Sequence, residues 1–228
     1  MKGRVLSILL IMIISVLGLN ACNVVKDKVY EATGAEYFEF TQREDGNYAV
    51  SAKEGATLPE KIKFPTEYEG KAVVEIKANG FKDNQTITEI IIPVGYEFIG
   101  VEAFSACEKL SSLNIGQHGG SSAVETEIGF GAFKGCNSLT SVTLGDCVKV
   151  IGGYAFYETL ITSLSSCRGL TKIDGHAFGN CTALKDFYIP ASLVDIHEDA
   201  FKGAKNVSFR VSDSNPKYTV EDGAIVSK

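Results

Sequence analysis

The sequence has a deficit of positive charge and contains no tryptophan. Lysine and arginine number 22 against 28 aspartates and glutamates, which leaves a formal net charge of -6. Proteins that gather phosphate backbones carry a basic surface, so this balance argues against nucleic acid as a partner. Proline is also scarce, at five residues, whereas glycine reaches 23. Such a composition is typical of many short strands joined by evenly spaced turns.

Motifs for catalysis and cofactor binding are also missing. The sequence contains no G-x-S-x-G nucleophile elbow, no phosphate-binding P-loop, no H-E-x-x-H motif and no dinucleotide fingerprint. It has three histidines, and none stands at ligand spacing from cysteine or from another histidine. We therefore expect a protein that is not an enzyme, with no cofactor and no metal site.

No hydrophobic run is as long as a membrane span. The longest, Val5–Leu19, has 15 residues, whereas a transmembrane helix needs about 20. Lys2 and Arg4 precede the run, and a basic start before a short apolar segment predicts a secretory signal peptide over residues 1–21. The protein is therefore expected to be exported.

The residues that follow this run resemble the lipobox of bacterial lipoproteins. They read Leu19-Asn20-Ala21-Cys22, with Asn20 where a small or aliphatic residue is usual. The resemblance implies acylation of Cys22, anchoring in the membrane at the bacterial cell surface, and a tether over residues 22–36. More than one acyl chain would hold the protein stably on the membrane. Ordinary cleavage nearby, with Cys22 incidental, is the alternative.

Phenylalanine and isoleucine recur with a period near 23 residues. The intervals between six phenylalanines are 23, 29, 23, 22 and 23 residues, and an isoleucine stands five residues before each. The phenylalanines are Phe81, Phe104, Phe133, Phe156, Phe178 and Phe201. The isoleucines are Ile76, Ile99, Ile128, Ile151, Ile173 and Ile196. A fixed period of this length is the signature of a repeat solenoid.

Each period also carries the pattern of a half-buried strand. Apolar residues stand nine and eleven positions after the phenylalanine and alternate with polar ones. The long interval carries six additional residues within 116–126, which predicts a loop. The repeat at Phe156 is one residue short, which shifts its apolar positions to Ile161 and Leu164.

The segment before the first full repeat predicts a cap. Tyr37–Phe40 and Tyr48–Val50 flank a turn at Asp45–Asn47, which is typical of a β-hairpin. Solenoids need such caps because their ends otherwise expose an apolar cross-section. We expect the cap and first strand over residues 37–72 and a repeat solenoid over residues 73–228. The solenoid should be mainly β with short helical turns, in about six coils of 22–23 residues.

These columns resemble the BspA-type leucine-rich repeat, a bacterial surface family with the approximate unit L-x-x-I-x-I-P-x-x-V-x-x-I-G-x-x-A-F-x-x-C. The best matches are Leu110–Phe133 and Leu184–Phe201, and the similarity covers residues 62–228. The family's ending is matched by Asp213–Tyr218 and Asp222–Gly223. The resemblance implies a leucine-rich-repeat-like fold. It also implies adhesion to a protein ligand on a host or neighbouring cell.

The cysteines fall into two groups. Cys107, Cys136 and Cys181 each stand three residues after a repeat phenylalanine, which favours a recurring buried slot over ligation of a metal. Cys147 and Cys167 lie in neighbouring turns, two positions out of register. An exported protein can form disulfides, and whether these two pair is left open by the sequence.

Polar residues beside the predicted strands form the candidate binding surface. We call them the outer strip: Thr88, Glu89, Ser111, Ser112, Thr140, Ser141, Thr162, Ser163, Lys185, Asp186 and Tyr188. A flat, weakly charged strip is suited to pairing with another protein surface. The structural alternative is that these hydroxyl groups only keep an exposed sheet soluble.

Protein binding is the leading functional hypothesis, and two others remain open. A carbohydrate or cell-wall module would use exposed Tyr96, Tyr154, Tyr157 and Tyr188 as stacking surfaces. A structural envelope spacer would have no soluble ligand.

Overall fold

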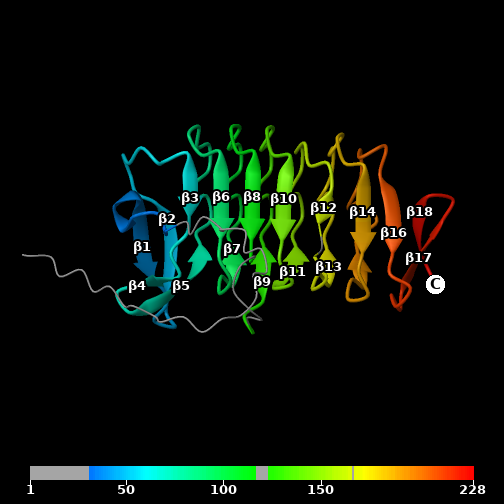
Figure 1. Cartoon of the computed structure of the whole chain (residues 1–228), viewed down its shortest axis with the longest axis horizontal. Coiled ribbons are helices and arrows are strands. Elements are labelled where there is room, and N and C mark those ends of the chain that lie inside the picture. Colours follow the sequence, from blue (N-terminus) through cyan, green and yellow to red (C-terminus); the bar gives the residue numbers. More distant parts are fainter. Residues whose placement is uncertain (1–30, 117–122, 166) are drawn as a thin grey trace, which may run out of the picture. The chain divides into compact units, whose positions relative to one another are not determined.

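The computed structural model describes residues 31–116, 123–165 and 167–228 (Figure 1). The predicted signal peptide at residues 1–21 and the predicted lipidation site Cys22 lie outside these described residues. Residues Glu31–Lys228 form one compact unit. Within the described ranges, no helix combines the length and the apolar character that crossing a bilayer requires.

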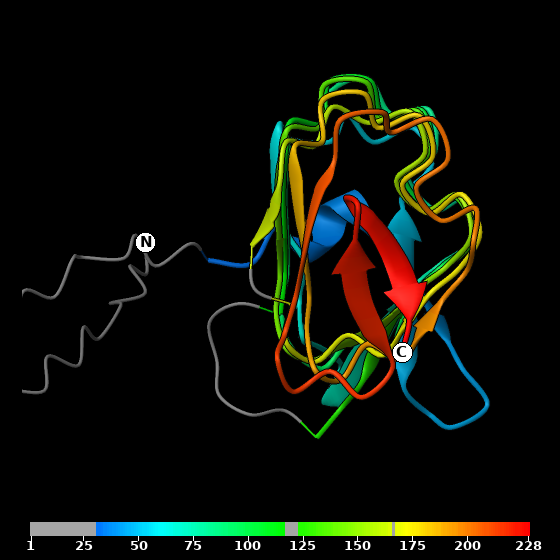
Figure 2. The same cartoon turned by 90° about the vertical axis from the view of Figure 1, so that its right-hand side faces the viewer.

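Successive coils stack so that most of them add one strand to each of two largely parallel sheets, and the coils superpose when viewed end-on (Figure 2). The first sheet runs in the order β12, β10, β8, β6, β3. Its strands are β3 (Lys61–Lys63), β6 (Glu89–Ile92), β8 (Ser112–Ile115), β10 (Ser141–Leu144) and β12 (Leu164–Ser165). Beyond β12, a separate parallel pair is formed by β14 (Asp186–Ile189) and β16 (Ser208–Val211).

The second sheet runs through the cap and the coils in the order β1, β2, β5, β7, β9, β11, β13, β15, with β4 beside β5. Its cap strands are β1 (Phe38–Gln42), β2 (Tyr48–Ala52) and β4 (Glu67–Tyr68). Its coil strands are β5 (Lys71–Ile76), β7 (Phe98–Ile99), β9 (Thr126–Ile128), β11 (Val148–Ile151), β13 (Lys172–Ile173) and β15 (Asp195–Ile196). A 3-10 helix, η1 (Ala35–Tyr37), precedes β1.

Both ends of the stack are covered by hairpins. The predicted N-terminal hairpin is confirmed, since β1 and β2 pair antiparallel, and β2 then pairs in parallel with β5. At the other end, β17 (Tyr218–Glu221) and β18 (Ala224–Ser227) form a second antiparallel hairpin. Both hairpins end a run of parallel coils, as solenoid caps do.

The sequence motif at the C-terminal end fastens the second hairpin to the last coils. Asn215 is buried, and its amide donates to the carbonyls of Pro190 (2.7 Å) and Leu193 (2.9 Å). Its oxygen accepts from the backbone N–H of Tyr218 at 2.8 Å. The Tyr218 hydroxyl oxygen in turn accepts from the N–H of Ile196 at 3.0 Å. The motif therefore holds the hairpin against the last coils. It does so by forming hydrogen bonds with main-chain groups that a further coil would otherwise bond.

The repeat phenylalanines form one continuous column, as the period predicts. Neighbouring rings stack with centroids 5.1 to 5.5 Å apart from Phe81 to Phe201. The alanine before the ring also has a role, because the N–H of Phe104 donates to the carbonyl of Ala132 in the next coil at 2.8 Å. Phe133 and Phe156 repeat this bond with the alanines of the coils that follow them. Each coil thus shields its neighbour by ring stacking and by a main-chain bond.

The expected short helical turns are not formed around these phenylalanines. In the described residues of the coils, the segment consists of hydrogen-bonded turns instead of helices. Residues two positions before and after the ring are left-handed, for example Glu102 (φ 51°) and Ala106 (φ 58°). Their N–H groups point to the next coil, where they donate to Phe130 and Lys134. Bonding between coils therefore replaces the bonds within a helical turn.

The irregular repeats keep the columns aligned. Residues 117–122 of the predicted loop lie outside the described residues, yet Ser112 and Ser141 on either side pair directly as neighbours. In the short repeat, the shifted apolar positions Ile161 and Leu164 are both buried, as predicted. The additional residues of the long interval are therefore absorbed outside the sheet, and the short repeat still buries its two shifted apolar positions.

Candidate binding surface

The outer strip follows the exposed side of the first sheet and continues onto β14. Glu89, Ser112 and Ser141 stand opposite one another on β6, β8 and β10 because the parallel strands pair without a register shift. Thr88, Ser111 and Thr140 directly precede them, and the same columns continue through Thr162 and Ser163 to Lys185 and Asp186. The structure thus brings ten of the predicted residues into two adjacent rows, and Tyr188 lies two positions beyond Asp186 on β14.

Part of the strip is tied to the backbone and part faces solvent. The Ser111 hydroxyl donates to the carbonyl of Thr88, and the Thr88 hydroxyl donates to the carbonyl of Glu60, both at 3.1 Å. These two hydroxyl groups support the structural alternative, because they link neighbouring coils. Ser111 is nevertheless exposed, as are Thr140, Ser141, Thr162 and Lys185. The exposed part of the strip therefore begins at Ser111.

The first sheet is interrupted between β12 and β14. β12 pairs with β10 through Val142 and Leu164, but β14 meets the coil of β12 only at a single bridge between Ser163 and Asp186. β14 and β16 then pair along their full length. Past Asp186, the side of β14 that faces β12 therefore has no ladder partner among the described strands.

The sequence offers a reason for this interruption. At the second inward position of the strand, four coils have buried aliphatic residues: Ile92, Ile115, Leu144 and Ile189. The coil of β12 has Ser166 at that sequence position, and Ser166 lies outside the described residues. Burial of apolar surface contributes about 25 cal/mol per Å², and the sequence of this coil lacks the aliphatic side chain that the other four coils bury at the position. The short coil therefore departs from the repeat pattern next to the interruption.

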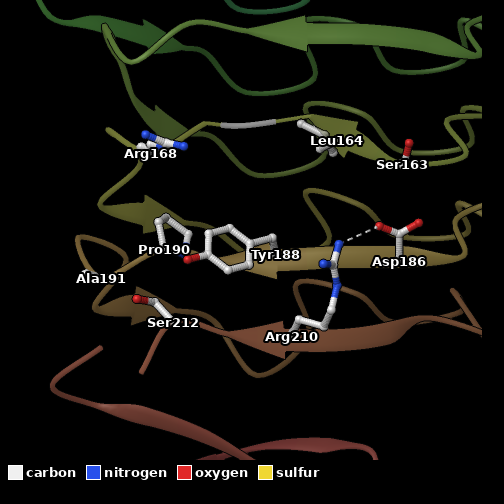
Figure 3. Close-up of a pocket in the computed structure, with 9 residues that line it drawn as sticks. All are labelled: Ser163, Leu164, Arg168, Asp186, Tyr188, Pro190, Ala191, Arg210 and Ser212. Carbon is white, nitrogen blue, oxygen red and sulfur yellow. Dashed lines mark hydrogen bonds and ion pairs between the residues drawn. The ribbon is translucent and has the colours of Figure 1, made fainter. Parts of the chain in front are cut away.

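A cavity of about 600 Å³ opens at this interruption (Figure 3). Its lining residues are Ser163, Leu164, Arg168, Asp186, Tyr188, Pro190, Ala191, Arg210 and Ser212. The volume falls within the range of small-molecule and peptide-side-chain pockets. Three residues of the outer strip, Ser163, Asp186 and Tyr188, are among them.

Two arginines give the cavity its charge. Arg210 on β16 pairs with Asp186 on β14 at 3.3 Å, and the Arg210 side chain is 67% exposed. The backbone at Arg168 is fixed from both sides, since its N–H donates to Asp146 at 3.0 Å and its carbonyl accepts from Ser192 at 2.6 Å. Among the described residues, no carboxylate forms an ion pair with the Arg168 guanidinium. The cavity therefore presents one paired and one unpaired guanidinium group.

Sequence reasoning missed both arginines. The available signal was their rarity, because the whole chain has four arginines: Arg4, Arg43, Arg168 and Arg210. Two of the four line one cavity, although they stand 42 residues apart in the sequence. Only the stacking of the coils places them together.

The tyrosines proposed as one stacking surface do not form one. The expectation that Tyr96 is exposed is wrong, because this side chain is fully buried and its hydroxyl donates to the carbonyl of Pro65 at 2.6 Å. Burial also raises the pKa of Tyr96. Tyr154 and Tyr157 are half-buried in the turn around Phe156, while Tyr188, 39% exposed, lies on β14.

The cysteines three residues after a repeat phenylalanine are buried, as their spacing predicts: Cys107, Cys136 and Cys181. The Sγ of Cys107 donates to the carbonyl of Phe81 in the preceding coil at 3.2 Å, and Cys136 and Cys181 make the equivalent bond. Burial raises the pKa of the Cys107 thiol to about 12, so it stays neutral at physiological pH. These thiols act as small buried donors between coils.

Cys147 and Cys167 do not form a disulfide, so the pairing left open by the sequence is absent from the structure. The Cys167 thiol faces the carbonyls of Gly145 (3.7 Å) and Val148 (3.6 Å), and burial raises its pKa to about 12. In the part of the chain that the structure describes, no group of three or more His, Cys, Asp or Glu residues is placed to hold a metal ion.

Coils that each add a strand to a parallel sheet over columns of leucine, isoleucine and phenylalanine define a leucine-rich-repeat solenoid. The chain belongs to the BspA-type leucine-rich repeat family. The family model matches residues 60–124 and 122–219 with six copies. A comparison with curated proteins found no match.

Solved structures of bacterial leucine-rich repeat proteins share this fold. The T. pallidum leucine-rich repeat protein is 21% identical, with a TM-score of 0.64 over 80% of this chain and 82% of that one. The pneumococcal vaccine antigen PcpA is 19% identical, with a TM-score of 0.65 over 84% of this chain and 52% of that one. A leucine-rich cell surface protein from Faecalibacterium prausnitzii is 21% identical, with a TM-score of 0.55 over 88% and 59%. At these identities the similarity establishes the fold alone.

Proposed function

We propose that this chain is a non-catalytic binding protein of the bacterial cell surface that attaches to a protein on a host or neighbouring cell through the outer strip. The observation that carries the proposal is the alignment of the strip across consecutive parallel strands. Stacked coils make such a surface long, flat and rigid, and solenoids commonly bind partners on surfaces of this kind.

The chemistry of the strip supports a protein partner. Charged residues are depleted at the centres of protein interfaces, and the exposed centre of the strip consists of Thr140, Ser141 and Thr162. The charged residues Glu89, Lys185 and Asp186 lie towards its two ends. A neutral centre with a charged periphery matches the anatomy of a standard interface.

The proposed location rests on the N-terminal sequence and on the relatives. The signal peptide over residues 1–21 and the lipobox-like Cys22 support export and anchoring by lipid. The F. prausnitzii neighbour is described as a cell surface protein, which agrees with this location. Mass spectrometry of the mature N-terminus tests it, with a diacylated or triacylated Cys22 as the expected result.

Substitution of the neutral centre tests the binding function. The purified full chain is applied to a panel of immobilised host-matrix and bacterial surface proteins, and saturable binding is measured by biolayer interferometry. Replacing Thr140, Ser141 and Thr162 with lysine should weaken binding by at least about tenfold, because long charged side chains prevent close approach.

A matched variant carries the same added charge elsewhere. Asn137, Ser138 and Asn206 are exposed turn residues outside the strip, and their replacement with lysine should leave binding unchanged. Equal loss in both variants would assign the effect to net charge and would contradict the strip as the interface. Binding to a glycan array, with none to the proteins, would favour the carbohydrate-module alternative.

A further inference from the structure

We propose that the cavity between β12 and β14 binds an extended acidic segment of the partner protein, whose carboxylates pair with Arg168 and Arg210. This inference rests on the proposed function, because it assigns a chemistry to the partner that the outer strip contacts. It also locates the strongest part of the contact at the C-terminal end of the strip.

The distribution of arginine supports an anionic ligand. Arg43 in the cap forms ion pairs with Asp45 (3.6 Å), Glu75 (3.5 Å) and Glu97 (3.0 Å), so its charge is neutralised within the fold. The other two arginines of the described residues, Arg168 and Arg210, line this one cavity. Against them stands a single lining carboxylate, Asp186, so the cavity is net positive on a chain with a formal charge of -6.

Arginine is suited to a carboxylate because its planar guanidinium group can donate two parallel hydrogen bonds. The present bond from Arg210 to Asp186 is a single, exposed contact of 3.3 Å, and such surface pairs contribute little stability. A ligand carboxylate can therefore take the place of Asp186 at low cost. Asp186 then acts as a weak internal competitor for the ligand.

The spacing of the two arginines fits a chain better than a single small anion. Arg168 follows β12 and Arg210 lies on β16, two coils further along the stack. Neighbouring strands are about 4.8 Å apart, so the two positions are separated by about 10 Å or more along the stack. An extended peptide rises about 3.3 Å per residue and would present carboxylates with this separation about three residues apart.

The apolar lining of the cavity favours a peptide over an acidic sugar. Leu164, Tyr188 and Pro190 offer apolar contacts beside the two arginines, with Tyr188 projecting into the cavity (Figure 3). A peptide with apolar side chains between its carboxylates can use both kinds of contact, whereas a sugar chain that carries only hydroxyl and carboxylate groups gains less from apolar side chains.

Binding of a fluorescein-labelled oligo-glutamate peptide to the purified full chain tests the inference, measured by fluorescence anisotropy. Saturable binding is expected, with a dissociation constant that rises with salt concentration because the contact is ionic. Arg168→Gln and Arg210→Gln should each weaken binding by about tenfold. Asp186→Asn should strengthen it, since it releases Arg210. Lys205→Gln, an equal charge change at an exposed turn, should leave binding unchanged.

Three results would overturn the inference: no saturable binding of oligo-glutamate, unchanged affinity in both arginine variants, or binding of oligogalacturonate without binding of oligo-glutamate. The last would assign the cavity to an acidic glycan. Failure of this inference is distinguishable from failure of the proposed function. The lysine variants of the strip keep both arginines. Loss of protein binding in those variants would therefore support the outer strip as the interface even if oligo-glutamate does not bind.

Discussion

The phenylalanine that marks each repeat stabilises the fold through its ring and through its backbone. Phe104, Phe133 and Phe156 are fully buried, with centroid separations of 5.3 and 5.4 Å and planes within 6° of parallel. Each ring therefore covers the ring of the next coil, and its N–H bonds to that coil as well. No residue of one coil can make these contacts alone, which is why stability depends on neighbours.

Truncation of an internal ring should therefore be costly. Phe133→Ala removes a buried ring between two others and should lower the free energy of unfolding by about 3 to 5 kcal/mol, measured by urea denaturation. Phe130→Ala is the control, because that ring is three residues away but 49% exposed, and its loss should cost less than about 1 kcal/mol. Similar losses in the two variants would contradict the role of the column.

The left-handed residues beside the ring are only partly predictable from residue type. Ala106, Tyr154 and His176 all have φ of 58°, although such side chains rarely adopt this conformation. Their N–H groups each donate to the next coil, at 2.8 Å for Ala106 and 3.1 Å for the other two. Bonds to a partner distant in the sequence thus outweigh the local preference, and the described parts of the coils lack the helical turns expected from the sequence.

At the scale of elements, the corners after β7, β9 and β11 of the second sheet are set by close approach of two coils. The N–H of Gly100 donates to the carbonyl of Ile76 at 2.8 Å, and Gly129 and Gly152 repeat the bond. A Cβ added at Gly100 would fall against the nitrogen of Ala78 and 2.6 Å from the Ile76 oxygen. These contacts are with main chain, which cannot rotate away.

Gly100→Ala should accordingly separate the strands on either side of the corner. We expect a loss of about 1 to 3 kcal/mol in the free energy of unfolding, as for overpacking of a core. Asp174→Ala is the control, since Asp174 occupies the equivalent corner two coils beyond Gly129 and already carries a Cβ. Its loss removes an exposed pair with Lys172 and should cost less than about 1 kcal/mol. Thermal melts of both variants would show the difference.

The strands themselves were largely predictable, because alternation of apolar and polar residues is local. The buried pairs Leu113 and Ile115 or Val142 and Leu144 lie where the pattern predicts them. The interruption beside β12 was not predicted, although the shortened repeat was visible in the sequence. Whether β12 and β14 pair depends on how two neighbouring coils fit together, and the pattern within one coil does not contain that information.

At the scale of the whole molecule, the coils lie side by side along the stack (Figure 1). The column of phenylalanine rings is continuous from Phe81 to Phe201. Such a solenoid tolerates a change in the number of coils better than a change of register within one. The aligned strands across the long interval illustrate this, since six additional residues leave Ser112 and Ser141 paired.

Removal of a whole coil should therefore leave a folded protein. Deletion of residues 134–156 takes out one 23-residue period and joins Phe133 to Tyr157, so every column stays in phase. We expect cooperative unfolding in urea with a lower m-value, because less surface is buried. Deletion of residues 134–145 shifts the columns and should abolish cooperative unfolding. A folded half-coil variant, or an unfolded whole-coil variant, would contradict the solenoid account.

The sequence by itself determined the repeat: its period, its buried columns, its strands and its N-terminal hairpin. These features were predictable because each depends on spacing along the chain. Successive side chains of a strand point to opposite faces, so the position of a residue within the strand decides whether it points inward or outward. The tertiary structure alone decided the left-handed turns, the burial of Tyr96, the free state of Cys147 and Cys167, and the cavity with Arg168 and Arg210. Each of these depends on which groups of different coils come into contact, and stacking sets those contacts between residues about 20 or more positions apart.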